Sequence, residues 1–153
     1  MSNILDAHRE LHMTSSPFPD VEPLACARSD VSQPYWDALE RGRLDLPHCN
    51  SCDSIFFFPR RWCPKCWSQD VGWVQASGRG TLYSRATVRM PFEGRSPDEI
   101  PYTIALIDLA EGVRLPGRLH PEAADLALDS EVTISFPSSP ATALPVWRAA
   151  SSA

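Results

Sequence analysis

Four cysteines stand in two pairs at a spacing that is typical of metal-binding knuckles. Cys49 and Cys52 form the first C-x2-C pair, and Cys63 and Cys66 form the second pair ten residues later. Two residues between thiolates allow a tight turn to direct both sulfur atoms at one ion, and two such turns complete a tetrahedron. Four soft thiolates favour zinc, with rubredoxin-like iron as one alternative and metal loss or redox pairing as another.

The complete set of four thiolates predicts one structural Zn²⁺ ion. Such a site has no open coordination position, so its role is to hold together a module that is too small to have a core of its own. The fifth cysteine, Cys26, lies outside the spacing and is interpreted as a free thiol, and the complete set leaves no vacancy for His48. The sequence contains no Ser/His/Asp set, no phosphate-binding glycine loop and no isolated carboxylate pair, so we expect no catalysis by this chain on its own.

The elements that must position these cysteines divide the chain into four segments. The first has no hydrophobic period and is interpreted as an extended N-terminal arm, the second as a helix, the third as the zinc ribbon and the fourth as a barrel. Their expected bounds are 1–31, 32–43, 44–76 and 77–150.

The helix expected over 32–43 is short. Pro34 suits its first turn and Gly42 ends it. Between them, Tyr35, Trp36 and Leu39 form an apolar stripe. This stripe predicts that one side of the helix packs against the rest of the protein.

After residue 80 the apolar residues alternate with a period of two, which predicts half-buried strands. In the first strand the alternation places Leu82, Ala86 and Val88 together on one face of a half-buried strand. A helical turn is expected between the third and fourth strands, and this order predicts a small Greek-key barrel of the OB type. The expected strands cover 81–89, 102–109, 113–119, 131–136 and 146–149. The fold class is therefore mainly β, with an N-terminal helix and a rubredoxin-like zinc ribbon before the OB-fold barrel.

Composition limits the size and the location of the protein. The chain has 153 residues, of which 43% are hydrophobic and 22% charged, as expected for one globular domain with or without a small module. Its 15 prolines exclude a helical bundle. No apolar run is long enough to cross a membrane, and charged residues interrupt the first twenty positions, so we expect a cytoplasmic protein with no membrane partner.

Further motifs surround the cysteine pairs from residue 35 to residue 136. They are Tyr35-Trp36-Asp37-Ala38-Leu39, Phe58-Pro59-Arg60, Ser77-Gly78-x-Gly80-x-Leu82-x-Ser84, Pro101-Tyr102, Glu111-Gly112-Val113-Arg114 and Val132-x-Ile134-x-Phe136. In this series the sequence resembles the small zinc-ribbon plus OB-fold proteins, long described as a domain of unknown function, that accompany thiolase-like enzymes acting on acyl-CoA. It departs from them at Leu128-Asp129-Ser130, where relatives often have a glycine.

The resemblance implies a non-catalytic accessory subunit. Members of the family bind thiolases, thiolase-like aldolases of steroid side-chain breakdown, or acyltransferases. Their ribbon and helix dock on the partner, and the barrel can line the acyl-CoA channel. The implied partners are therefore a thiolase-like enzyme subunit and an acyl-CoA, in lipid or steroid metabolism.

Aromatic and arginine side chains are candidates for these contacts. Aromatic residues near the knuckles either form the small ribbon core or anchor a protein partner, and the interface candidates are Tyr35, Trp36, Phe57, Trp62 and Trp67. Guanidinium groups bind phosphate bidentately, so we expect Arg85, Arg89 and Arg114 to bind the CoA phosphates as a group. The connection over 90–101 is long, and it is either a surface loop or a part of the substrate channel.

The alternative function is binding of single-stranded nucleic acid by the OB barrel. This function requires a basic groove and stacking aromatic residues. The formal net charge of the chain is −5, and five acidic and six basic residues give only +1 over 79–118. The charge therefore disfavours nucleic acid. A small redox protein is a third class, which visible absorbance would reveal.

Overall fold

The computed structural model describes residues 29–90, 100–136 and 145–150. The predicted N-terminal arm, apart from its last three residues, lies outside the described residues, as do Cys26 and most of the long connection over 90–101. Among the described residues no helix is long and apolar enough to cross a membrane.

The first element of the described chain is a short helix, α1 (Gln33–Glu40), which lies within the segment 32–43 where the sequence predicts a helix. Pro34 lies in its first turn, where a missing N–H costs nothing. After the helix, Gly42 adopts a φ of +70°, a left-handed conformation that glycine accepts without a steric penalty. Tyr35 and Ala38 form the buried side of the helix.

The ribbon is a two-stranded antiparallel sheet of β1 (Asp45–Cys49) and β2 (Val71–Gln75). Its strands pair from Asp45 with Gln75 to Cys49 with Val71. Among the described residues, the small buried cluster at the knuckles consists of Cys49, Phe56 and Cys63, with Cys52 and Val71 packed against it. So few apolar contacts cannot hold two loops in place, which is why a bound metal ion is needed there.

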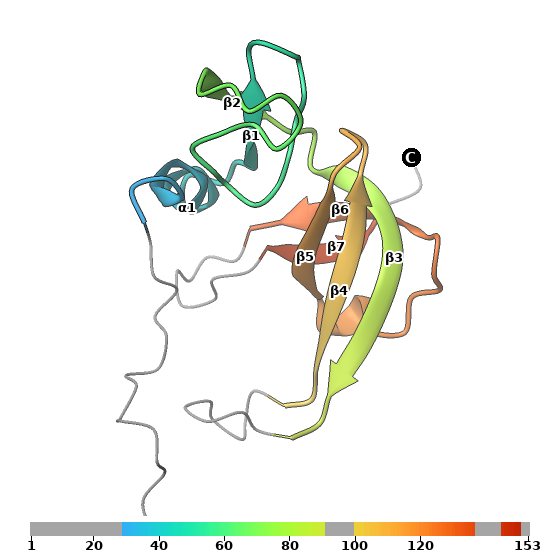
Figure 1. Ribbon diagram of the computed structural model, residues 1–153. Helices are drawn as coiled ribbons and strands as arrows, with labels where there is room; N and C mark the ends of the chain where they lie inside the picture. Colours follow the sequence, from blue (N-terminus) through green and yellow to red (C-terminus); the bar gives the residue numbers. More distant parts are fainter. Residues whose placement is uncertain (1–28, 91–99, 137–144, 151–153) are drawn as a thin grey trace, which may run out of the picture.

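Five strands form a closed barrel in the order β3-β4-β5-β7-β6, and this confirms the predicted fold class. β5 and β7 run parallel, and the other neighbours are antiparallel. The turn η2 (Pro121–Ala123) lies between the third and fourth barrel strands, as an OB fold requires. The strands are β3 (Arg79–Val88), β4 (Tyr102–Leu109), β5 (Arg114–Leu119), β6 (Glu131–Ser135) and β7 (Val146–Ala149). In Figure 1 the β3–β4 hairpin runs away from the ribbon along one side of the barrel.

The barrel interior is filled around Trp147, which has no exposed surface. Leu82, Ile107 and Leu115 are equally inaccessible to solvent. Gly117 faces the indole so closely that a Cβ atom there would lie 2.4 Å from Nε1 of Trp147. The tryptophan therefore fits only because the neighbouring strand has a glycine at this position.

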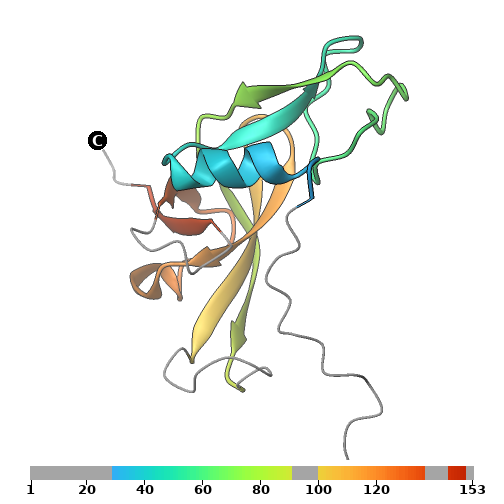
Figure 2. The same ribbon diagram turned by 90° about the vertical axis from the view of Figure 1, so that its left-hand side faces the viewer.

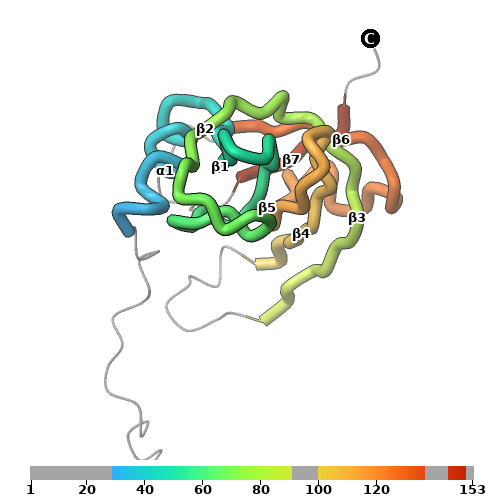
Figure 3. Tube along the Cα trace, turned by 45° about the horizontal axis from the view of Figure 1, so that its top comes forward, coloured from blue at the N-terminus to red at the C-terminus, as the bar shows by residue number. Residues whose placement is uncertain are grey.

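The same buried core continues from the barrel into the helix and the ribbon. Tyr35, Leu44 and Leu46 belong to one cluster with the interior residues of the barrel. Figure 2 shows α1 lying between the ribbon strands and the end of the barrel, and Figure 3 shows the helix and β3 on opposite sides of the molecule. The helix thus joins the metal-binding part of the chain to the barrel.

A β-bulge in β3 reverses the face that its second half presents. The register shifts between Leu82, which opposes Ile107, and Ser84, which opposes Leu106. Beyond this shift Ala86 and Val88 oppose Ile104 and Tyr102, and residues that oppose each other share a face. The prediction that Ala86 and Val88 share a face with Leu82 is therefore wrong, because one extra residue at the bulge moves them to the outside.

The tight turn before β6 contains an aspartate in a left-handed conformation. Asp129 has a φ of +65°, in the left-handed region that aspartate tolerates better than most residues do. Its N–H donates a hydrogen bond to the carbonyl oxygen of Leu82 at 2.8 Å. Asp129 thus adopts a conformation that glycine more often provides.

Candidate metal centre and surrounding surfaces

The four cysteine side chains of the two knuckles converge on one point. Their Sγ atoms all lie within 4.8 Å of one another. Cys49 and Cys66 are separated by 3.6 Å, and Cys52 and Cys63 also by 3.6 Å. A tetrahedral zinc ion with Zn–S bonds of about 2.3 Å needs sulfur atoms about 3.8 Å apart. The prediction that these cysteines are placed to bind one metal ion is confirmed, and their spacing fits zinc.

The two knuckles repeat one local backbone arrangement. The N–H of the first cysteine donates to the carbonyl oxygen five residues later, from Cys49 to Ser54 and from Cys63 to Ser68, each at 2.9 Å. The residue after the second cysteine is left-handed in both, with φ of +59° at Asp53 and +61° at Trp67. Both knuckles therefore have the same backbone shape, and each holds a non-glycine residue in a left-handed conformation at a cost in backbone strain.

Side-chain contacts hold the two knuckles against each other. Ser51 Oγ and Ser68 Oγ lie 2.7 Å apart, and the amide of Asn50 donates to the carboxylate of Asp70 at 2.8 Å. The backbone N–H of Lys65 also approaches Sγ of Cys63 at 3.4 Å. These contacts fix the separation of the thiolates around the ion.

The crowded thiols change one another's pKa. A hydrogen bond with Ser54 lowers the pKa of Cys52 to about 6. At Cys66 a backbone hydrogen bond from Ser68 favours the thiolate, but contacts with the other thiols and partial burial outweigh it and raise the pKa to about 12. Neighbouring thiolates repel one another, and a bound divalent ion would offset that repulsion.

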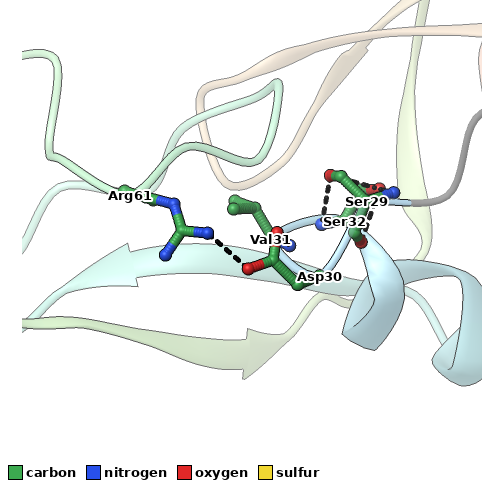
Figure 4. Close-up of polar contacts among 5 residues, drawn as sticks. All are labelled: Ser29, Asp30, Val31, Ser32 and Arg61. Atoms are coloured by element: carbon green, nitrogen blue, oxygen red, sulfur yellow. Dashed lines mark hydrogen bonds and ion pairs between the residues drawn. The ribbon is translucent and has the colours of Figure 1, made fainter.

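The start of the helix is tied to the ribbon by one ion pair. Arg61 reaches from the loop between the knuckles to the carboxylate of Asp30, while Ser29 and Ser32 bond to each other beside it (Figure 4). A groove of ≈ 470 Å³ follows this contact. It is lined by Asp30, Val31, Pro34, Arg60, Arg61, Trp62, Gln69, Val71 and Trp73.

The five aromatic interface candidates lie in two different environments. Tyr35 is buried, and its ring centroid is 5.0 Å from that of Trp36 and 5.4 Å from that of Phe57. Burial raises the pKa of Tyr35 above its ordinary value. Trp62 and Trp67, by contrast, are 47% and 77% exposed. The structure thus gathers the first three where the helix meets the ribbon and leaves the two tryptophans on the surface.

The three arginine candidates do not share one face. Arg114 donates to both carboxylate oxygens of Asp108, at 2.6 and 2.8 Å, on the outside of the barrel. Arg85 follows the bulge and donates to the carbonyl oxygen of Ala124 at 2.6 Å. Arg89 lies one residue beyond β3 and is exposed. Their role in binding CoA phosphates stays a prediction.

Sequence reasoning did not find the partners of Arg114. Its guanidinium carbon lies 3.2 Å from the ring centroid of Tyr83, and its hydrogen bond lowers the pKa of Asp108. A signal for the ion pair exists, because Asp108 and Arg114 flank a tight turn that sets them opposite each other. Tyr83 gives no such signal, because it lies in the bulge.

This arrangement bears on the nucleic-acid alternative. The face of Tyr83 that Arg114 covers is closed to a stacking base, and the guanidinium already satisfies a carboxylate. Single-stranded nucleic acid needs both kinds of group to be free. The Tyr83–Arg114 pair is therefore not free to make the stacking and phosphate contacts that this function requires.

A four-cysteine ribbon followed by a five-stranded OB barrel defines the class of small zinc-ribbon and OB-fold proteins. Within this class, residues 36–72 match the family model for the rubredoxin-like zinc ribbon domain of ChsH2. Residues 73–137 match the model for the C-terminal OB-fold domain of ChsH2. The chain belongs to this ChsH2 family.

Two curated relatives are similar to part of this chain. A probable enoyl-CoA hydratase alpha subunit from Thermomonospora curvata is 32% identical over 118 residues, which are 76% of this chain and 36% of the relative. The benzoylsuccinyl-CoA thiolase subunit BbsA from Thauera aromatica is 31% identical over 87 residues, 57% of this chain and 58% of the relative. The chain therefore spans well under two thirds of either relative.

One solved structure is similar over nearly its whole length. It is a chain of the Ltp2-ChsH2(DUF35) aldolase, with a TM-score of 0.69 and 29% sequence identity. The similarity covers 80% of this chain and 97% of that chain.

Proposed function

We propose that this chain is a non-catalytic accessory subunit of a thiolase-like enzyme that acts on a CoA thioester. One observation carries the proposal: the same ribbon and barrel are similar to parts of proteins named as a hydratase, a thiolase and an aldolase. These three reactions differ in the bonds that they make and break. A module shared among them is best explained by binding and positioning, and CoA is common to two of the names.

The chemistry of the described residues supports this role. The four thiolates would surround zinc completely, and a closed site has no position for a substrate. The two described histidines bond to Asp53 and to the N–H of Glu122. Neither is paired with a hydroxyl or thiol nucleophile in the part of the chain that the structure describes.

Exposed aromatic side chains on the ribbon supply the docking surface. Trp62 and Trp67 are large, rigid and exposed, which makes them suitable anchors for a protein partner. Trp36 and Phe57 are half-buried where the helix meets the ribbon, and both rings pack against the buried ring of Tyr35. The helix and the ribbon would then both contribute aromatic side chains to the contact with the partner.

The barrel would contribute to the channel for the CoA thioester. Of the arginine group, Arg89 is best placed to accept a phosphate because it has no carboxylate partner among the described residues. Arg85 and Arg114 would bind phosphate only if they exchange their contacts with Ala124 and Asp108. We therefore expect Arg89 to contribute most to CoA binding.

Affinity purification of the tagged full chain from its native source tests the proposal. We expect a thiolase-like subunit to be recovered in a fixed ratio and identified by mass spectrometry. A Cys49→Ser variant serves as the control. It loses a buried metal ligand, so it should recover much less of the thiolase-like subunit than the wild-type chain does. Recovery of no acyl-CoA enzyme, together with tight binding of single-stranded RNA, would refute the proposal.

A further inference from the structure

The outside of the β3–β4–β5 sheet carries apolar side chains along β4, although water favours polar side chains there. Polar residues on the same side are Ser84, Asp108, Arg114 and Arg118. Strand pairing places six apolar residues on this side, here named the outer face: Ala86, Val88, Tyr102, Ile104, Leu106 and Pro116. The alternate residues Thr103, Ala105 and Ile107 point inward and are buried. Ile104 and Leu106 remain 40% and 36% exposed. An antiparallel sheet with one solvated face normally alternates apolar and polar residues, so this face is suited to being covered.

The closed barrel restricts what can cover the outer face. β4 is hydrogen-bonded to β3 on one side and to β5 on the other, so it offers no free edge to an added strand. The face extends about 13 Å along β4, from Tyr102 to Leu106, and about 10 Å across the three strands. These dimensions match one side of an α-helix of two to three turns, which is about 10 Å wide.

The charges beside the outer face indicate the chemistry of the occupant. Arg114 is neutralised by Asp108 at one end of the face. Arg118 lies near the other end, with its guanidinium carbon 4.5 Å from the ring centroid of Tyr102. It has no carboxylate within ion-pair distance in the described ranges. Counting the described residues alone, the face carries one uncompensated positive charge, which favours an acidic partner and disfavours a second copy of the same face.

We propose that the outer face docks an amphipathic helix of the partner enzyme subunit, with its apolar stripe over Ile104 and Leu106 and a carboxylate opposite Arg118. The identity of that subunit rests on the proposed function. The face itself rests on strand register, exposure and charge. The chain would then hold its partner at two places, the ribbon tryptophans and this side of the barrel.

Binding measurements with charged substitutions test the docking face. The partner subunit that copurifies with the wild-type chain is identified by mass spectrometry and purified, and its Kd is measured by biolayer interferometry. We expect Ile104→Glu and Leu106→Glu each to weaken binding at least tenfold, because both would place a charge in an apolar contact. Arg118→Glu should weaken binding more than Arg118→Gln does. Leu128→Glu is the matched control, because Leu128 is 55% exposed outside the outer face, and its Kd should stay within twofold.

Each outcome of this experiment decides one proposal. Variants that bind within twofold of wild type, with normal circular dichroism and zinc content, overturn the docking face and leave the accessory role intact. If the wild-type chain recovers no thiolase-like enzyme, the accessory role fails. The recovered partner can also be an identified protein that is not a thiolase-like enzyme. If the Ile104→Glu variant no longer binds that protein and the Leu128→Glu variant still does, the result supports the docking face. A wild-type dimer that Ile104→Glu converts to a monomer assigns the face to a second copy and overturns the proposal.

Discussion

Replacing Trp67 by glycine should strengthen the metal knuckle and weaken the docking surface at the same time. Trp67 has a φ of +61°, although 77% of its side chain is exposed. An L-residue in this conformation costs roughly 1–2 kcal/mol, whereas glycine loses roughly 0.5–1 kcal/mol more chain entropy on folding. The difference favours Trp67→Gly by about 1 kcal/mol. Little burial is lost to offset it.

Zinc retention measures this gain because metal binding and ribbon folding are coupled. A gain of about 1 kcal/mol corresponds to about fivefold tighter zinc retention, measured by competition with a chelator of known affinity. Trp67→Ala keeps the strained conformation, so its zinc retention should stay near that of wild type. Both variants lack the indole, and both should lower the affinity for the partner subunit at least tenfold.

Asp53→Gly provides the matched control in the other knuckle. Asp53 has a φ of +59° but also bonds to His48 at 2.7 Å, so the gain in zinc retention should be smaller. Its partner affinity should not change. Weaker zinc retention in Trp67→Gly would contradict the strain argument, and unchanged partner affinity in Trp67→Ala would show that Trp67 is not an anchor.

Three further perturbations test the metal site, a surface ion pair and the core. Cys49→Ser should reduce bound zinc, measured by atomic emission, from one ion per chain to nearly none, because the ribbon's buried cluster cannot hold the knuckles alone. The pKa of Asp108 is lowered by a hydrogen bond from its arginine partner, so its stabilisation is present above about pH 4 and is lost as the pH falls through the folded-state pKa. Asp108→Asn should therefore lower the urea midpoint at pH 7 but not at pH 2, and an equal loss at both values would contradict this. Gly117→Ala places a Cβ atom 2.4 Å from Trp147, so it should lower the free energy of unfolding in urea by about 1–3 kcal/mol. Gly72→Ala is the control, because its nearest contact is at 3.6 Å, and it should change this free energy by less than about 0.5 kcal/mol.

Local patterns predicted most of the fold and the metal centre. The cysteine spacing sufficed for the four thiolates because each knuckle is a short turn whose geometry depends on neighbouring residues. The period of two predicted the barrel strands, and Pro34 and Gly42 marked the ends of the helix. These features depend on residues that are close in the sequence.

The features that the sequence did not reveal depend on long-range pairing. The alternation around Leu82 gives no sign of the bulge, so Ala86 and Val88 were placed on the wrong face. The contact of Arg85 with Ala124 joins residues 39 positions apart, and no local pattern records it. The exposed apolar side of β4 likewise became visible only when its pairing with β3 was known.

The bulge at Tyr83 also has an evolutionary consequence. Loss of this single residue by an in-frame deletion would shift the second half of β3 by one position. Ala86 and Val88 would then turn inward, and Arg85 would turn toward solvent and leave the carbonyl of Ala124. Deletion of one codon therefore exchanges the apolar and the polar faces of this half of the hairpin. Related barrels can gain or lose an apolar binding surface in this way without a change in any of their apolar residues.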